Sequence, residues 1–377
     1  MLNKLIIKNV CSIDECVIDL KKNKYSFYED NVIGDCVNPV ALYGHNGSGK
    51  SAVFKAVKTL IALQTASVDF LFPFIVNQFE LVKYKKLKDE NLLIGSILLD
   101  FDIGNQNYVY YLSTSRKNII PLESLQKNGE FIFKYENGSI MYKEKEYPLD
   151  QNISKLVPAL RILASREIED SDILSSYNYI SNFTFVDLPL QSSMMPFVSS
   201  KLFSNISRFE LMSQKSKEVR ELLKEYEEFP LYDIKKENSD SLMGNNMQQY
   251  KVYMDDIPDV GLPIEMMSEG MKNQSLLLSI LTSLPNDSVL FVDELEQALH
   301  PSTIISFLNV VKKKNVQLLF SSHNTHILQH LRPDQIYFAK WEKGFSKYYR
   351  LSKIHPNIRE INNIEKMYLS NTFDIGD

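Results

Sequence analysis

The stretch PVALYGHNGSGKSA at residues 39–52 is the feature that most restricts how this 377-residue chain folds. An apolar run, Val40 to Tyr43, breaks into a glycine-rich turn, and an apolar-periodic helix follows from Ala52. The turn fits the pattern G-x-x-x-x-G-K-[ST], in which successive backbone N–H groups cradle phosphates. Glycines are required there because the loop adopts backbone angles that a Cβ would forbid. A strand before the loop and a helix after it favour a phosphate-binding loop over a chance match in a flexible turn.

The same pattern assigns individual side chains to a nucleotide. Its lysine, here Lys50, reaches the β- and γ-phosphate oxygens, and its hydroxyl, here Ser51, is a ligand of Mg²⁺. We therefore expect the chain to bind a nucleoside triphosphate with Mg²⁺. The predicted nucleotide-binding residues of this segment are Gly44, Asn46, Gly47, Ser48, Gly49, Lys50, Ser51 and Ala52.

Composition excludes several classes of protein. Hydrophobic residues make up 44% and charged residues 24% of the chain, which is typical of a globular protein and argues against wholesale disorder. A net charge of −5 argues against a broadly basic, nucleic-acid-coating surface, although a local basic groove is invisible in the total. Cys11, Cys16 and Cys36 lack C-x-x-C spacing, which indicates reduced thiols rather than a metal or redox site. No signal peptide and no run of about 18 apolar residues is present, so we expect a cytoplasmic protein without a membrane span.

Pattern changes along the chain predict three regions. Residues 1–150 form an N-terminal nucleotide-binding lobe, in which the short alternating runs of 92–150 indicate antiparallel hairpins. Residues 151–255 form a helical and irregular insertion arm. Residues 256–377 form a C-terminal lobe that alternates helices with continuous apolar strands, which are typical of a parallel sheet. The predicted fold class is α/β, with a mixed central sheet, an antiparallel β lobe and an inserted helical arm.

Two further strands end in residues suited to phosphate chemistry. The strand VLFVDE ends in Asp293 and Glu294. An aspartate in that place can hold Mg²⁺ opposite Ser51, and the glutamate can orient or deprotonate a water for in-line attack on the γ-phosphate. The alternative, two carboxylates that cap the next helix, is disfavoured by the phosphate loop upstream. His323 follows the next strand and is predicted to hydrogen-bond the γ-phosphate or the attacking water, although a lone histidine is more often structural.

A fourth motif, MSEGMKNQ at residues 267–274, stands just before a helix. Ser268 and Gly270 offer a hydroxyl, backbone amides and the positive end of the helix dipole, which together make an anion site. Taken alone, Ser-Glu-Gly is equally typical of an ordinary helix cap.

In this order the four motifs resemble the ABC-type ATPase head family, which includes chromosome-maintenance, RecF-type and defence-associated ATPases. Gly44–Ser51 resembles its phosphate loop and Ser268-Glu269-Gly270 its signature motif, with Met267 and Met271 in place of the usual Leu and second Gly. Glu294 stands in the catalytic position and His323 in the switch-histidine position.

A closer resemblance is to the AAA-15 or AAA-21-like ATPases of bacterial abortive-infection and antiphage defence systems. It is carried by DELEQALHPS at 293–302, SSHNTHIL at 321–328, LRPDQIYFAKWEKGFSKYYRLS at 331–352 and EKMYLSNTFDIGD at 365–377. Together with the opening strands and the loop, the resemblance covers somewhat over half the chain, and we rely on no resemblance for residues 126–255.

The resemblance implies a P-loop NTPase fold of ABC-head type and Mg²⁺-dependent hydrolysis of ATP by a homodimer. In such a dimer the phosphate loop of one protomer holds ATP, and Ser268 and Gly270 of the other protomer close over the γ-phosphate. The implied catalytic residues are Glu294, His323 and Lys50, and the implied metal ligands are Ser51, Asp293 and Gln78.

Three functions are compatible with this assignment. The resemblance favours an ATPase that senses infection and controls a separate effector protein, a nuclease or a toxin. A RecF-type ATPase of DNA repair or recombination is the alternative, and it predicts a basic groove from runs such as Lys83–Lys88 or Lys312–Lys314, which are otherwise solvated faces. A scaffold that binds ATP without turnover is disfavoured by the intact Glu294.

Overall fold

The structure, a computed structural model, describes residues 1–66, 93–115, 120–136, 138–148, 157–166, 170–186, 198–199, 201–203, 206–224, 232–240, 246–297, 299 and 301–374. Gln78 and the basic run Lys83–Lys88 lie outside these residues.

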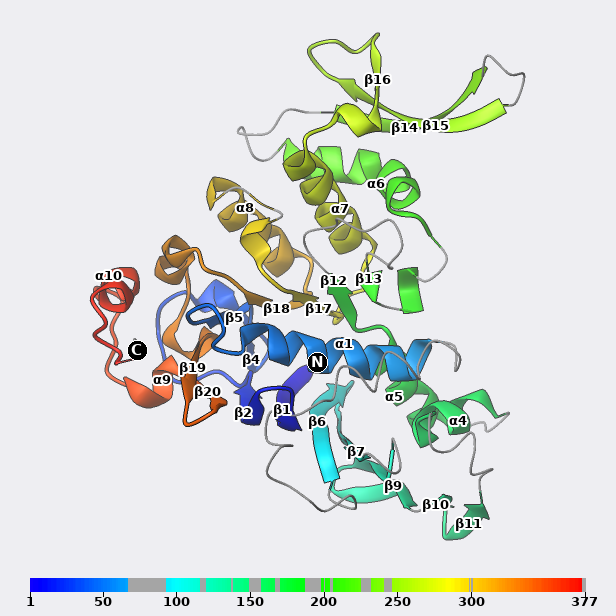
Figure 1. Cartoon of the computed structure of the whole chain (residues 1–377), viewed down its shortest axis with the longest axis vertical. Coiled ribbons are helices and arrows are strands. Elements are labelled where there is room, and N and C mark those ends of the chain that lie inside the picture. The colour runs from blue at the N-terminus through cyan, green and yellow to red at the C-terminus, as the bar shows by residue number, and fades with distance from the viewer. Residues whose placement is uncertain are drawn as a thin grey trace.

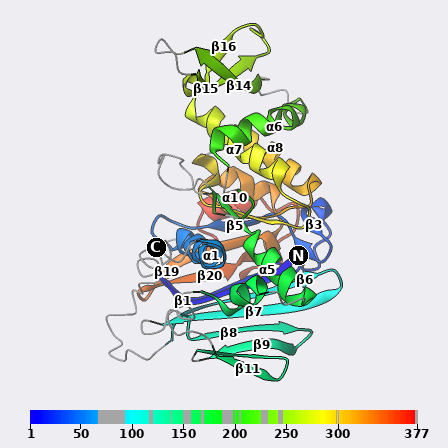
Figure 2. The same ribbon diagram turned by 90° about the vertical axis from the view of Figure 1, so that its right-hand side faces the viewer.

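One continuous 15-stranded sheet passes through the described part of the chain (Figures 1 and 2). Its antiparallel part forms the lower half of the molecule in both views, and its parallel part lies at the centre. In spatial order the strands are β11 (Lys145–Pro148), β10 (Ser139–Tyr142), β9 (Glu130–Glu136), β8 (Leu122–Lys127), β7 (Gln106–Ser115), β6 (Leu93–Ile103), β1 (Leu2–Val10), β2 (Ile13–Asp19), β20 (Phe345–Arg350), β19 (Ile336–Glu342), β5 (Val40–Tyr43), β18 (Gln317–Ser321), β17 (Val289–Val292), β12 (Thr184–Val186) and β13 (Val198–Ser199).

The two parts of the sheet differ in strand direction as the sequence patterns predicted. Neighbouring strands from β11 to β2 are antiparallel, which confirms the hairpins expected over residues 92–150. Neighbouring strands from β19 to β12 are parallel. All four residues of β17 are fully buried, as expected for an apolar strand that is covered on both faces.

Helices cover both faces of the parallel strands. Val289 and Phe291 of β17 belong to one hydrophobic cluster with α1 (Lys50–Thr65), α4 (Ala159–Ser165) and α5 (Ser171–Ser181). Leu290 and Val292 belong to a second cluster, with α6 (Arg208–Leu223), α7 (Glu269–Ser283) and α8 (Pro301–Lys313). Because side chains alternate along a strand, one short strand contributes to both cores.

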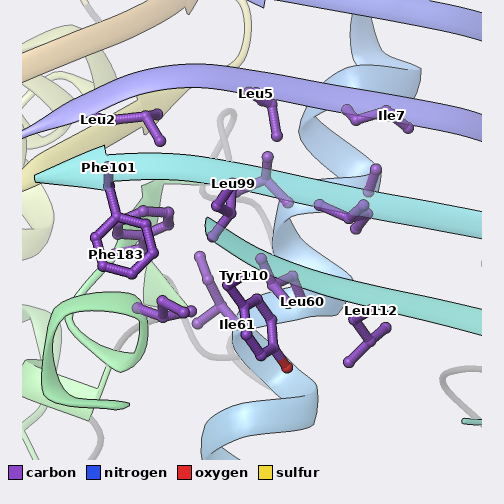
Figure 3. Close-up of a cluster of buried hydrophobic side chains, with 14 of the residues drawn as sticks. Leu2, Leu5, Ile7, Leu60, Ile61, Leu99, Phe101, Tyr110, Leu112 and Phe183 are labelled. Atoms are coloured by element: carbon purple, nitrogen blue, oxygen red, sulfur yellow. The ribbon is translucent and has the colours of Figure 1, made fainter. Parts of the chain in front are cut away.

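The first cluster also joins α1 to the antiparallel part of the sheet. Figure 3 shows Leu60 and Ile61 of α1 with Leu99 and Leu112 of the neighbouring strands. The predicted apolar face of α1 is buried throughout, and it comprises Val53, Ala56, Val57, Leu60 and Ile61. This packing fixes the axis of the helix that follows the glycine-rich loop.

The predicted insertion arm is divided between two places: α4 and α5 lie beside the antiparallel lobe, whereas α6 lies towards the opposite end of the molecule (Figure 1). Helix α6 begins after Ser207, whose hydroxyl accepts the Glu210 N–H at 3.2 Å. The predicted apolar residues Val219 and Leu223 of this helix are buried. The structure adds a sheet of order β14 (Tyr232–Asp240), β15 (Asn246–Met254) and β16 (Gly261–Pro263) beyond α6. The bounds of the three predicted regions remain a prediction.

The C-terminal hairpin β19–β20 connects the two parts of the sheet. Its turn is Lys343–Gly344, where both residues have positive φ angles of 50° and 88°. β20 pairs with β2 at Ser346 and Ile13, and β19 pairs along β5. A segment near the end of the chain therefore lies between the N-terminal strands and the strand that precedes the loop.

After β18 the chain forms the 3-10 helix η6 (Thr325–His330), which packs on α10 (Ile364–Leu369). Thr325 and Gln329 donate side-chain hydrogen bonds to the Glu365 carboxylate. The remaining short elements are β3 (Val32–Ile33), β4 (Cys36–Val37), α9 (Leu351–Ile354) and the 3-10 helices η1 (Glu29–Asn31), η3 (Lys201–Phe203), η4 (Ile264–Met266), η5 (Leu295–Gln297) and η7 (Pro333–Gln335).

Within the described ranges, no helix combines the length and the apolarity that crossing a membrane requires. Cys16 and Cys36 are buried, Cys11 is half-buried, and none of the three forms a disulfide.

Candidate nucleotide site

The glycine-rich loop stands between β5 and α1, in the strand–loop–helix context that the sequence predicted. Gly44, Gly47 and Gly49 all have positive φ angles, of 149°, 78° and 102°. At Gly44 a Cβ would lie 2.3 Å from the carbonyl oxygen of Ala339. The loop therefore adopts a path that requires glycine both for its backbone angles and for its contact with β19.

Lys50 is the first residue of α1, and its side chain turns back along the loop. Its Nζ donates hydrogen bonds to the carbonyls of Gly44 at 2.8 Å and His45 at 3.1 Å. Burial lowers the pKa of Lys50, and the charges of three carboxylates, Asp293 first and then Glu294 and Glu296, act to raise it.

Strand register explains why these groups meet. Leu42 of β5 pairs with Ser321 of β18, and Phe320 of β18 pairs with Val292 of β17. Because the three strands are parallel, the residues that follow each of them lie at the same edge of the sheet. That edge brings together the loop, the Asp293–Glu294 pair and the segment Ser322–His323.

Ser321 connects the acidic pair to the neighbouring strand. Its hydroxyl donates to the Asp293 carboxylate at 2.5 Å and accepts the backbone N–H of Glu294 at 2.8 Å. Glu294 has a positive φ of 55°, and its carboxylate accepts a hydrogen bond from the side chain of Gln297. Hydrogen bonds therefore fix the turn after β17 at both Asp293 and Glu294.

Glu296 holds the segment that carries the predicted histidine. Its Oε1 accepts the backbone N–H of His323 at 2.7 Å. The side chain of His323 is exposed at this edge. Sequence reasoning missed both Glu296 and Ser321, because a glutamate in a helical turn and a serine at a strand end are common, and only strand register gives them partners.

Unpaired polar atoms gather at the same edge. Ser48 Oγ, Glu296 Oε2 and Asn324 Nδ2 are buried and have no hydrogen-bond partner within the described structure. Buried polar atoms are normally paired, so these atoms fit a site that takes a polar ligand. Ser51 and Asp293 are half-buried and supply a hydroxyl and a carboxylate, which are ligand types that Mg²⁺ accepts. In the described ranges no group of three His, Cys, Asp or Glu side chains forms a metal cluster.

The predicted signature residues lie elsewhere. Ser268 caps α7 by accepting the Met271 N–H at 3.3 Å, and Ser268 and Gly270 are both exposed. In Figures 1 and 2 the start of α7 lies beside β16, away from the start of α1. Asn273, further along α7, donates to the Gln297 carbonyl at 3.4 Å. Helix α7 thus contacts η5 at Gln297, while its first residues are exposed.

Residues 193–329 match the family model described as "AAA domain, putative AbiEii toxin, Type IV TA system". The match includes Ser268, Asp293, Glu294 and His323, and it agrees with the resemblance predicted from the sequence. It also extends over residues 193–255, for which the sequence reading relied on no resemblance. The chain has a P-loop ATPase fold, with a mixed α/β sheet and a glycine-rich loop between β5 and α1, and it is called the head below. The phosphate loop of the head precedes the matched segment.

Three solved structures are similar to the chain at low sequence identity. The Smc head bound to the C-terminal winged-helix domain of ScpA is 16% identical, with a TM-score of 0.49 over 93% of this chain and 99% of that chain. The SMC head domain from Thermotoga maritima is 14% identical, with a TM-score of 0.44 over 93% and 98%. The recombination mediator protein RecF with ATPγS is 13% identical, with a TM-score of 0.38 over 92% and 98%. Among curated proteins, none matches the sequence.

Proposed function

We propose that the head binds ATP at the edge formed by β5, β18 and β17 and hydrolyses it with Mg²⁺. The observation that carries this proposal is the strand register that brings the loop of positive-φ glycines, with Lys50 after it, and the Asp293–Glu294 pair to one edge of the sheet. A cation beside backbone amides suits the phosphates, and the carboxylates suit a metal ion and a water.

Each residue at the edge has a distinct part in this proposal. Ser51 and Asp293 would hold Mg²⁺, and the ion would neutralise part of the phosphate charge. Lys50 exchanges its hydrogen bonds to the loop carbonyls for phosphate oxygens. Glu294 orients the attacking water, and His323 contacts the γ-phosphate or that water. Gln78, predicted as a further metal ligand, remains a prediction because it lies outside the described residues.

Two copies of the head are proposed to enclose ATP between them. Ser268 and Gly270 are exposed at a helix start, and Gly270 has open space where a Cβ would stand. A helix N-terminus with a serine hydroxyl is suited to a phosphate of the facing copy. Two such surfaces related by a two-fold axis would complete two sites.

A mixing experiment tests the proposed dimer. We expect Lys50→Ala and Ser268→Arg each to abolish steady-state ATP hydrolysis. In an equimolar mixture, half of the dimers pair one variant with the other and contain one intact site, so about a quarter of the wild-type rate should return. No recovery, with both variants folded and the mixed dimer shown to form in ATP, would contradict a site shared between protomers.

The proposed biological role is regulation of a separate effector in antiphage defence. The matched family model supports it, because its description names a toxin system. The alternative, a RecF-like DNA-binding ATPase, requires basic residues that are available to DNA. Lys312 pairs with Asp30 at 2.9 Å and Lys314 donates to the Thr282 carbonyl at 3.1 Å, so this basic run is engaged within the chain.

Capture of partners from the native host distinguishes the two roles. The Glu294→Gln variant, which is expected to bind ATP without rapid hydrolysis, serves as bait in a pull-down with ATP and Mg²⁺. The lysate is used with and without nuclease treatment. A stoichiometric protein that survives nuclease would support the defence role. Recovery of nucleic acid, with all partners lost on digestion, would overturn it in favour of the RecF-like role.

A further inference from the structure

The carbonyl group of the peptide between Gly49 and Lys50 accepts two hydrogen bonds. The carbonyl oxygen of Gly49 accepts the N–H of Ala52 at 3.0 Å, which closes a turn at the start of α1. It also accepts the hydroxyl of Tyr348 at 2.8 Å, from strand β20 nearly 300 residues later. Burial raises the pKa of Tyr348 well above its usual value, so the hydroxyl stays protonated as a donor.

The hydrogen bonds at the Gly49 carbonyl also orient the N–H group at the other end of the same peptide. A trans peptide is planar, and its C=O and N–H point in opposite directions. When Tyr348 and Ala52 fix the Gly49 carbonyl, they also fix the direction of the Lys50 N–H. That N–H is one of the successive amides that a phosphate loop presents to its anion.

The strand that carries Tyr348 is itself anchored beside the loop. The backbone N–H of Ser346 donates to the Ser12 carbonyl at 2.8 Å, and its hydroxyl donates to the Ser12 hydroxyl at 2.8 Å. Ser346 is fully buried, and its Oγ lies 2.0 Å from where a Cβ of Gly49 would stand. The β1–β2 turn, the C-terminal hairpin and the loop are therefore in direct contact.

We propose that Tyr348 is a positioning residue for the nucleotide: its hydroxyl holds the Gly49–Lys50 peptide so that the Lys50 N–H faces the phosphates. The inference rests on the proposed function of the same edge. It assigns to the C-terminal hairpin a part in nucleotide affinity, although the hairpin contributes no residue to the predicted site.

The test compares two tyrosines of the same strand. Tyr348→Phe removes only the hydroxyl that reaches Gly49. The matched control is Tyr349→Phe, because the Tyr349 hydroxyl donates to Glu342 within the hairpin at 2.9 Å. Isothermal titration calorimetry with Mg²⁺ and a non-hydrolysable ATP analogue gives affinity and stoichiometry, and thermal unfolding without nucleotide gives stability.

We expect Tyr348→Phe to weaken affinity about five- to tenfold, the loss typical of one hydrogen bond, with unchanged stoichiometry and a raised KM but little change in kcat. Tyr349→Phe should bind as the wild type does. A merely structural role would lower the melting temperature and the stoichiometry, and would leave the affinity of the folded fraction unchanged. That pattern, or wild-type affinity in Tyr348→Phe, would overturn the inference while the proposed function stands. Failure of the wild-type head to bind the analogue would overturn the proposed function itself.

Discussion

The hydroxyl of Ser321 lies 2.5 Å from the Asp293 carboxylate, to which it donates a hydrogen bond. The same oxygen accepts the Glu294 N–H, so one serine of β18 fixes both members of the acidic pair at the end of β17. Ser321 is fully buried, and its two partners are separated from it by 27 or 28 positions in the sequence.

Ser321→Ala should therefore affect both stability and catalysis. Loss of the hydroxyl leaves the Glu294 N–H and one Asp293 oxygen without this partner, which we expect to cost about 1–2 kcal/mol of unfolding free energy and to slow ATP turnover. Ser288→Ala is the control, because its hydroxyl donates to the Pro285 carbonyl near the other end of β17. Urea unfolding and phosphate-release assays report the two effects. Equal turnover in both variants would show that Ser321 does not position the acidic pair.

Lys50→Ala should abolish detectable binding of ATP. The variant removes the buried ammonium that lies among the carbonyls of the loop and near three carboxylates. Calorimetric titration of ATP with Mg²⁺ measures the loss. Lys55→Ala, which removes an exposed lysine from the same helix, should retain binding. Unchanged affinity in Lys50→Ala would remove the basis for assigning this loop to phosphate.

Glu294→Gln should bind ATP but hydrolyse it at least about tenfold more slowly, because an amide cannot take a proton from the attacking water. Single-turnover assays separate this effect from binding. The matched variant Glu130→Gln changes an exposed glutamate of the antiparallel lobe and should hydrolyse ATP normally. Normal turnover in Glu294→Gln would move the catalytic function to another residue.

Gly49→Ala should destabilise the head more than Gly344→Ala does. Both glycines have positive φ, 102° and 88°, which costs about 1 kcal/mol for a residue with a Cβ. Only at Gly49 would the new Cβ also meet Ser346, at 2.0 Å from its Oγ, whereas nothing lies within 4 Å at Gly344. Urea unfolding without nucleotide compares the variants. Equal losses would mean that Ser346 moves aside at no measurable cost.

The antiparallel lobe contains a carboxyl group that should make stability depend on pH. Glu123 of β8 is 2% exposed and accepts hydrogen bonds from the N–H groups of Ala159 at 2.5 Å and Leu160 at 2.9 Å and from the Tyr110 hydroxyl at 2.8 Å. Burial outweighs these donors and raises the pKa of Glu123 from 4.5 to about 7.

The folded chain binds the proton of the Glu123 carboxyl more tightly than the unfolded chain does, so protonation of Glu123 favours the folded state. The contribution of Glu123 to stability is fully present below pH 4.5 and is lost as the pH rises through about 7, a loss of about 3 kcal/mol. Glu123→Gln, which cannot ionise, should flatten the decline in unfolding free energy between these pH values. Urea unfolding at a series of pH values checks this, and an equally steep decline in Glu123→Gln would assign the dependence to other groups.

Local sequence patterns were sufficient for much of this molecule. The order of apolar residues and glycines at 39–52 predicted strand, loop and helix, because a buried strand and a positive-φ loop each require particular residue types at particular positions. The buried face of α1 and the alternation of the antiparallel strands followed from the helical and strand periods for the same reason. Asp293, Glu294 and His323 were predicted as site residues from their positions just after apolar strands.

Tertiary structure decided which distant residues support these groups. Ser321 acts on Asp293 through the register of two parallel strands, Glu296 meets His323 through a turn, and Tyr348 reaches Gly49 because a C-terminal hairpin lies between two parts of one sheet. No local pattern marks such residues, since a buried serine or tyrosine looks the same in the sequence whatever it contacts. The sequence by itself determined the glycine-rich loop and the apolar strand that ends at Asp293 and Glu294, because positive backbone angles and burial each require particular residue types at neighbouring positions. Their alignment at one edge is a property of strand pairing, which joins residues that the chain keeps far apart.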